Sequence, residues 1–202
     1  MDAADIALRA AAVVVGYLLG SVDFGVIVPR MFGIDIYGTG SGNPGATNVL
    51  RTVGRREAAL VLLGDLAKGA AAAALGNWAG GEVIGFAAGL AAVVGHCFPV
   101  WHRFRGGKGV AAAGGMVLLL EPFAGLILLG AFVAVVALSR KASLGSLIAA
   151  VALVPTLAAF GHRGWSLGLA GAAVALIVIR HLPNIRRLLG GREHTIEEEA
   201  EG

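Results

Sequence analysis

Apolar segments follow one another along almost the whole 202-residue chain, and no long polar stretch separates them. They lie near residues 4–28, 57–76, 82–100, 109–120, 123–139, 143–160 and 165–182. In lipid a segment must satisfy its backbone hydrogen bonds internally, so apolar runs of this length predict membrane helices. We therefore expect an all-α integral membrane protein with about seven transmembrane helices, forming one polytopic domain over residues 1–202.

The fourth segment is shorter than the others. A dozen residues rise about 18 Å as a helix, whereas the hydrocarbon core of a bilayer is about 30 Å thick. Glu121-Pro122 should end this helix, because proline lacks the donor needed to continue it. We expect residues 109–120 to form a short or re-entrant segment.

The basic residues predict the orientation of the chain. If the loop near residues 38–51 faces the cytoplasm, so do thirteen of the sixteen lysines and arginines. By the positive-inside rule this places the N-terminus outside and the C-terminus in the cytoplasm. The thirteen are Arg30, Arg51, Arg55, Arg56, Arg103, Arg105, Lys108, Arg140, Lys141, Arg180, Arg186, Arg187 and Arg192.

The first polar stretch, GTGSGNPGATNVLR, occupies residues 38–51. Its glycines permit positive backbone φ angles, so that successive N–H groups can surround an anion. Hydroxyl, amide and guanidinium groups add donors suited to a phosphate. The residues in question are Gly38, Gly40, Gly42 and Gly45, with Ser41, Thr47, Asn48 and Arg51.

The second polar stretch, GHCFPVWHRFRGGKG, occupies residues 95–109. Gly106, Gly107 and Gly109 surround Lys108 where the next apolar segment opens, which favours a second phosphate site at a helix start. The stretch lacks the GxxxxGK[ST] pattern, so nucleotide hydrolysis is not implied. A flexible turn with a snorkelling lysine is the alternative interpretation.

The third polar stretch, RHLPNIRRLLGGRE, occupies residues 180–193. His181 and Asn184 are three residues apart and would share a helical face. Pro183, however, disfavours helix at Leu182 and weakens that argument. The basic and leucine residues that follow are typical of an interfacial segment, and His181 could equally be an interfacial histidine without a role.

The three stretches together resemble the PlsY family, the membrane-bound acyl-phosphate:glycerol-3-phosphate acyltransferases of bacterial phospholipid synthesis. LLGSVDFG at 18–25 and LLGDLAKG at 62–69 extend the resemblance over nearly the whole chain. It implies acyl transfer from an acyl phosphate to the 1-hydroxyl of glycerol 3-phosphate, giving lysophosphatidic acid and phosphate. It also implies a bacterial plasma membrane location with a cytoplasmic active site, no cofactor, and neither acyl-CoA nor acyl carrier protein as direct donor.

The resemblance assigns catalytic roles to Ser41, Arg51, Lys108 and His181. Either His181 or a substrate phosphate oxygen would accept the proton. Ser41 would donate a hydrogen bond, and its use as an acyl-accepting nucleophile is the disfavoured alternative. Substrate-binding roles are expected for Gly40, Gly42, Asn43, Gly45, Thr47, Asn48, Arg105, Gly106, Gly107, Gly109, Ser143 and Asn184.

Charged residues outside these stretches have simpler interpretations. Asp65 and Lys68, three apart in an apolar segment, should neutralise each other within the membrane. Asp23 departs from the family's usual GS-x-P pattern, and a buried carboxylate there would need a partner or a raised pKa. Chemistry at a metal ion is not expected, because Cys97 is the single cysteine and no Cys/His cluster has ligand spacing. The residues after Glu193, about the last ten of the chain, look like a solvated acidic tail.

A small transporter or channel for an organic phosphate is the alternative function. Glycine-broken helices and basic loops also occur in permeases, whose binding sites lie near the membrane midplane between internal repeats. The two halves of this sequence show no convincing repeat, and the glycine-rich stretches lie at the ends of the apolar segments. The acyltransferase hypothesis is therefore favoured over the transporter hypothesis.

Overall fold

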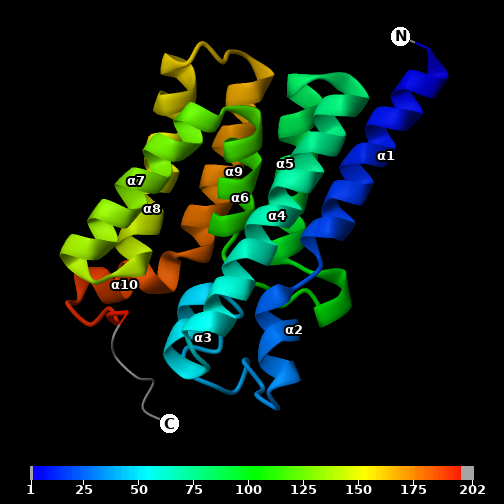
Figure 1. Ribbon diagram of the computed structural model, residues 1–202. Helices are drawn as coiled ribbons and strands as arrows, with labels where there is room; N and C mark the ends of the chain where they lie inside the picture. Colours follow the sequence, from blue (N-terminus) through cyan, green and yellow to red (C-terminus); the bar gives the residue numbers. More distant parts are fainter. Residues whose placement is uncertain (1, 197–202) are drawn as a thin grey trace.

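The computed structural model describes residues 2–196, which form a bundle of helices (Figure 1). The all-α prediction is confirmed, since each predicted apolar segment contains a helix. The helices are α1 (Ala3–Gly20), α2 (Phe24–Met31), α3 (Ala46–Thr52), α4 (Arg55–Gly80), α5 (Glu82–Cys97), α6 (Val110–Leu120), α7 (Pro122–Ser139), α8 (Ala142–Ala159), α9 (Trp165–Arg180) and α10 (Leu182–Leu189), with a 3₁₀ turn, η1 (Val100–His102), before α6.

Five stretches are long and apolar enough to cross a membrane: Ala3–Met31, Arg55–Gly80, Glu82–His102, Pro122–Ser139 and Ala142–Ala159. A sixth results if α9 and α10, which meet at a bend of 58°, are counted as one span. The prediction of a short fourth segment is confirmed, because α6 has 11 residues and rises only about 17 Å. Seven apolar segments are present, but α6 does not reach the length of a span.

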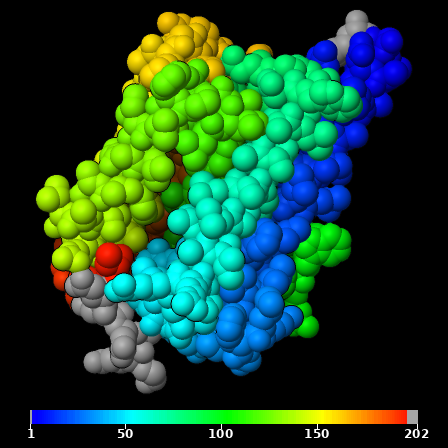
Figure 2. All heavy atoms as spheres, viewed as in Figure 1, coloured from blue at the N-terminus to red at the C-terminus, as the bar shows by residue number. Residues whose placement is uncertain are grey.

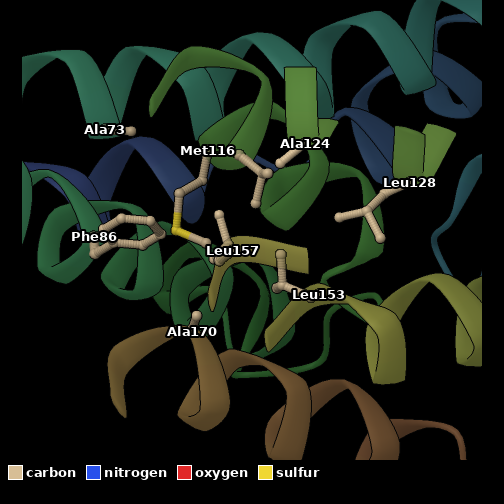
Figure 3. Packing of buried hydrophobic residues seen from close by; sticks show 9 residues of the cluster. Ala73, Phe86, Met116, Ala124, Leu128, Leu153, Leu157 and Ala170 are labelled. Carbon is tan, nitrogen blue, oxygen red and sulfur yellow. The ribbon is translucent and has the colours of Figure 1, made fainter. Parts of the chain in front are cut away.

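Longer helices surround α6. It packs against α4, α5 and α7. Met116 and Val117 of α6 belong to one buried hydrophobic cluster, and Ala112 and Ala113 belong to another. Figure 3 shows Met116 of α6 between Phe86 of α5 and Leu157 of α8. The start of α6, where Lys108 and Gly109 lie, is therefore held inside the bundle.

Glycines allow these helices to approach closely. A Cβ atom on Gly69 of α4 would overlap the carbonyl oxygen of Ala112, and one on Gly115 of α6 would overlap that of Leu66. Small residues at helix contacts serve the same purpose in membrane proteins generally. Part of the high glycine content of the chain is thus explained by packing of α4 against α6.

The first apolar segment is not one continuous helix, as residues 4–28 were predicted to be. It breaks at residues 21–23 between α1 and α2, where the Ser21 hydroxyl donates to the carbonyl oxygen of Tyr17 at 2.9 Å. The ammonium of Lys68 donates to the carbonyl oxygen of Val22 at 2.8 Å. A backbone group freed by the break therefore has a partner inside the bundle, as membrane depth requires.

The last apolar segment ends at Arg180, and α10 leaves it at an angle. Pro183 occupies the first turn of α10, where no amide donor is needed. His181 and Asn184 accordingly do not share one continuous helical face. Leu182, where Pro183 was expected to disfavour helix, is the first residue of α10, and the interruption lies at His181.

The three polar stretches come together at one end of the bundle. In Figure 1, α2, α3 and α10 lie at the end opposite the N-terminus. The Tyr37 hydroxyl donates to the carbonyl oxygen of Arg105 at 2.6 Å, which joins the chain before the first stretch to the second. The fold thus collects motif residues that are far apart in the sequence.

Candidate active site

A cavity of about 270 Å³ lies where the three polar stretches meet. They contribute to one cavity, whereas the sequence predicted two phosphate sites. The predicted residues Gly40, Gly42, Arg105, Gly106 and Gly107 lie outside its lining. Those that line it are Ser41, Asn43, Gly45, Thr47, Asn48, Arg51, Lys108, Gly109, Ser143, His181 and Asn184.

The first glycine-rich loop is shaped by its own amide side chain. The Oδ1 atom of Asn48 accepts from the backbone N–H of Ser41 at 2.9 Å, and its Nδ2 donates to the carbonyl oxygen of Thr39 at 3.0 Å. Gly40 and Gly42 adopt positive φ angles of 61° and 67°, as predicted. Gly45 has a φ of −127°, so that part of the prediction is wrong. Asn48 therefore acts first as a brace for the loop.

Gly38 is the other exception in this loop, because positive φ angles among its glycines occur at residues 40 and 42 and not at 38. Its amide N–H donates to the carbonyl oxygen of Asp35 at 3.1 Å. Gly38 and Gly45 therefore do not adopt the positive φ angles that the sequence interpretation expected of them.

The second loop rests on His96 of α5. A Cβ atom on Gly106 would overlap the His96 carbonyl oxygen, and one on Gly107 would overlap the imidazole ring. The Gly107 amide donates to the His96 carbonyl oxygen at 3.0 Å. Gly109, with a φ of 86°, turns the chain into α6. The glycines that flank Lys108 are required by this close approach.

Arg180 holds the opposite side of the second loop. Its Nε donates to the carbonyl oxygen of Gly107 at 3.0 Å, and its Nη2 donates to that of Gly106 at 2.7 Å. The guanidinium also lies 5.4 Å from the ring centre of Phe98, a cation–π distance. From the sequence, Arg180 was expected to have only a topological role. Its position directly before His181, in the third stretch, was the one sequence feature that indicated a further role for Arg180.

Lys108 points from the second stretch to the third. Its ammonium donates to Oδ1 of Asn184 at 2.7 Å. Burial lowers the pKa of Lys108 to about 8, and the charge of Glu193 opposes that shift. A partly desolvated cation in the cavity is suited to binding a phosphate, since Coulomb attraction strengthens as water is excluded.

His181 is buried at the bend between α9 and α10, with 2% of its surface exposed. Its Nδ1 lies 2.8 Å from the carbonyl oxygen of Ile177. Because a carbonyl oxygen only accepts, Nδ1 carries the proton, and a neutral ring keeps its lone pair on Nε2. His181 can therefore accept a proton in the cavity.

Glu193 organises the third stretch, a role that was not predicted from the sequence. Its Oε1 accepts from Nδ2 of Asn184 at 2.6 Å and from the Ser143 hydroxyl at 2.9 Å. Its Oε2 accepts from Nε of Arg187 at 2.8 Å. Burial favours a higher pKa for Glu193, but these hydrogen bonds outweigh it and hold the pKa below the usual range. Of the predicted acidic tail, residues 197–202 lie outside the described part of the chain.

A buried group of charges lies beside the cavity. Asp65 and Lys68 are 2.7 Å apart, so the predicted pair is confirmed. His96 adds its Nδ1 at 3.4 Å from the same carboxylate oxygen. Asp65 and His96 both line the cavity. The pair is therefore both self-neutralising and part of the site wall, and His96 links it to the second loop.

Asp23 lies fully buried at the break between α1 and α2. Two residues further on, a Cβ atom on Gly25 would overlap the carbonyl oxygen of Pro44 in the first stretch. Both carboxylate oxygens of Asp23 are buried without a hydrogen-bond partner among the described residues. The partner that its burial was expected to need is therefore not found in the described part of the chain.

The remaining lining of the cavity is apolar. Figure 2 shows the surface hollowed between α4 (cyan) and α7 (yellow-green). A polar end that holds cations thus continues into an apolar groove between helices. The groove residues include Leu62 and Leu66 of α4, Val117 and Leu118 of α6, Leu128, Leu129 and Phe132 of α7, and Leu153 of α8.

Between residues 2 and 196, His, Cys, Asp and Glu side chains form no group of three that could hold a metal ion. The buried Cys97 is a free thiol. The titratable and charged groups that line the cavity include Arg51, Lys108, His181, Asp65, His96 and Glu193.

The sequence matches a known family over most of its length. A family model described as glycerol-3-phosphate acyltransferase covers residues 10–191. The glycerol-3-phosphate acyltransferase of Rhizobium meliloti (strain 1021) is 48% identical over 189 residues, which are 93% of this chain and 92% of the relative. The glycerol-3-phosphate acyltransferase of Pseudomonas paraeruginosa (strain DSM 24068 / PA7) is 46% identical over 182 residues, which are 89% of this chain and 95% of the relative.

Two solved structures share the fold. Both are crystal structures of PlsY (YgiH), an integral membrane glycerol 3-phosphate acyltransferase. The glycerol 3-phosphate form matches with a TM-score of 0.90 at 38% identity, and the lysophosphatidic acid form with 0.87 at 37%. Each match covers 93% of this chain and 94% of the other.

The hydrogen bonds of Glu193 yield a test of its role. Glu193→Gln should destabilise the folded protein by about 1.5–3 kcal/mol, the range for hydrogen bonds to a charged group. Because the folded pKa is lowered, the carboxylate's contribution is present above about pH 4.5, the ordinary value, and is lost as the pH falls. The Tm difference between wild type and Glu193→Gln in detergent should be constant near neutrality and shrink in acid.

Glu57→Gln, which removes a half-buried glutamate in the first turn of α4 outside the cavity, is the matched control and should lower the Tm less than Glu193→Gln does. A Tm of Glu193→Gln equal to that of this control at neutral pH would contradict the role assigned to Glu193.

Proposed function

The chain belongs to the glycerol-3-phosphate acyltransferase family and is an integral membrane enzyme of that family, and on this premise we propose that it transfers a fatty acyl group from an acyl phosphate to the 1-hydroxyl of sn-glycerol 3-phosphate. The products are lysophosphatidic acid and inorganic phosphate. Acyl phosphate is the direct donor, in place of acyl-CoA or acyl carrier protein, and no cofactor takes part.

The observation that carries this proposal is the joining of a cationic pocket to an apolar groove in one cavity. An acyl phosphate has a phosphate head and an apolar tail, and glycerol 3-phosphate has a second phosphate. The polar end offers Arg51 and Lys108 to phosphates, and the groove offers apolar side chains to the acyl chain. The similar PlsY structures in glycerol 3-phosphate and lysophosphatidic acid forms support this assignment.

The residues divide by role. Lys108, Arg51 and the first loop, including Asn43, Gly45 and Thr47, hold phosphate. Ser41 donates to a phosphate or to the carbonyl oxygen as it gains charge. Asn184 and Ser143, both held by Glu193, orient glycerol 3-phosphate beside His181. Gly40, Gly42, Gly106 and Gly107 contribute by shaping the two loops.

The reaction needs no acyl-enzyme, because an acyl phosphate is already activated. The glycerol 1-hydroxyl oxygen attacks the acyl carbonyl carbon, the bond from that carbon to the phosphate oxygen breaks, and phosphate leaves. The hydroxyl proton passes to Nε2 of His181 or to an oxygen of the departing phosphate. The protein contributes alignment of the two substrates and stabilisation of the developing negative charge.

The reaction itself is the first test. Purified protein in lipid mesophase, given palmitoyl phosphate and labelled glycerol 3-phosphate, should release one phosphate for each labelled lysophosphatidic acid. Lys108→Ala should lower kcat/KM by roughly 10²–10³, as for loss of a donor to a developing oxyanion. In wild type, kcat/KM should fall as the pH rises through about 8, because Lys108 then loses its charge.

Arg55→Ala is the control, because Arg55 is exposed at the same end of the bundle and outside the cavity. The kcat/KM of Arg55→Ala should stay within about twofold of the wild-type value, because substitutions at the surface have small effects. Label accumulating in sealed vesicles without any lipid product would favour a transporter and defeat the proposal.

Direct transfer makes a separate prediction for Ser41. Ser41→Ala should lose roughly 10²–10³ in rate, as for one oxyanion donor, and Ser41→Thr should keep part of the activity. Enzyme incubated with acyl phosphate alone should show an unchanged intact mass. A kinetically competent acyl adduct on Ser41 would rule out direct transfer and leave the acyltransferase assignment standing.

We further propose that the cavity opens toward the cytoplasm of the bacterial cell, with the N-terminus outside. The basic loops support this orientation by the positive-inside rule. In a Cys97→Ser background, Gly38→Cys should resist a membrane-impermeant thiol reagent in intact cells, and Trp165→Cys should react. Gly38 has room for a Cβ atom, and Trp165 is exposed near the opposite end. The reverse labelling pattern would overturn the orientation.

A further inference from the structure

Exposed aromatic and basic side chains gather where two candidate spans end. The spans Ala3–Met31 and Glu82–His102 finish at this end of the bundle. We call the group the arginine–aromatic patch. Trp101 and Phe104 are 64% and 58% exposed, and Met31 and Phe32 are also exposed. The patch consists of Arg30, Met31, Phe32, Trp101, Arg103, Phe104 and Arg105.

The charge of the patch has one sign. Residues 97–109 contain no carboxylate. Between residues 29 and 38 the sequence has one, Asp35, whose Oδ1 accepts from the Tyr37 amide. The positive charges of Arg105 and Arg30 both act on the Tyr37 hydroxyl, so these arginines lie on the same side of the protein. Such a surface attracts anions.

The patch is continuous with the second glycine-rich loop. Residues 103–105 are exposed, whereas Gly106 and Gly107, which follow directly, are buried against His96. Arg103 and Phe104 adopt left-handed φ angles of 53° and 60°, a conformation that costs of order 1–3 kcal/mol for residues other than glycine. This backbone turns the side chains of the patch outward and Lys108 inward.

Aromatic rings and arginines at the end of a membrane span fit the headgroup layer of a bilayer. Tryptophan prefers that depth, and each arginine near an anionic membrane surface gains about 1 kcal/mol. Neither Arg103 nor Arg105 lines the cavity, so Arg105 is better placed for this role than for the substrate contact predicted from the sequence.

We propose that the arginine–aromatic patch binds the headgroups of anionic phospholipids in the surrounding bilayer and so holds residues 106–109 in place. The partner is the membrane itself. Bound lipid offsets the repulsion among the arginines and the strained turn at residues 103–104. Binding of the lipid is independent of the proposed reaction, but its effect on catalysis rests on that reaction.

The test uses the full protein with Trp78→Phe and Trp165→Phe, which leaves Trp101 as the single tryptophan. In nanodiscs, phosphatidylglycerol brominated near its headgroup should quench Trp101 more than equally brominated phosphatidylcholine at the same mole fraction. Arg103→Gln with Arg105→Gln should remove this preference, which is on the order of fivefold per arginine. The same pair should abolish any rise in kcat/KM that phosphatidylglycerol causes in the parent.

Arg55→Gln with Arg56→Gln is the matched control, because it removes two exposed arginines at the same end of the bundle but outside the patch. This pair should keep the preference for phosphatidylglycerol. Equal quenching by the two lipids in the parent protein, or equal loss in both arginine pairs, would overturn the proposal. Quenching needs no turnover, so it decides on lipid binding even if the proposed reaction fails.

Discussion

The carboxylate of Glu193 is the constraint on which the substrate end of the cavity depends. It accepts hydrogen bonds from Ser143 on α8, from Asn184 on α10 and from Arg187. Asn184 in turn accepts from Lys108 at the start of α6. A chain of charge-assisted hydrogen bonds thus joins three helices around the cavity, and such bonds are stronger than neutral ones. Without this chain of hydrogen bonds, the ammonium group of Lys108 and the side-chain amide of Asn184 would have no fixed relative position.

An apolar bundle tolerates charged groups beside the second loop because they are buried as a neutralising set. Asp65 pairs with Lys68 and lies beside His96, and burying such a set costs less than burying a lone ion. His96 also supports the glycine-rich loop that carries Lys108. The same interactions that stabilise the fold therefore also position Lys108. The wall of the apolar groove beside Lys108 is formed by core side chains of α6, α7 and α8.

Local features of this protein were predictable from the sequence, and long-range ones were not. The apolar segments, the short helix at residues 110–120 and the Asp65–Lys68 pair follow from hydropathy and i,i+3 spacing. Glu193 was missed because its partner Ser143 lies fifty residues away, and nothing next to Glu193 in the sequence indicates that contact. Arg180 was missed for a similar reason, since its two backbone contacts are with a distant loop. The break at residues 21–23 was hidden because Lys68, which stabilises it, belongs to another helix.

The central claim is that the three polar stretches form one phosphate-binding site at the mouth of an apolar groove. A crystal structure of this protein grown in lipid mesophase with glycerol 3-phosphate tests it most directly. The account predicts the substrate phosphate inside the 270 Å³ cavity, within hydrogen-bond distance of Nζ of Lys108. A phosphate bound only outside the cavity, for example between Arg103 and Arg105, with the cavity empty, would contradict it.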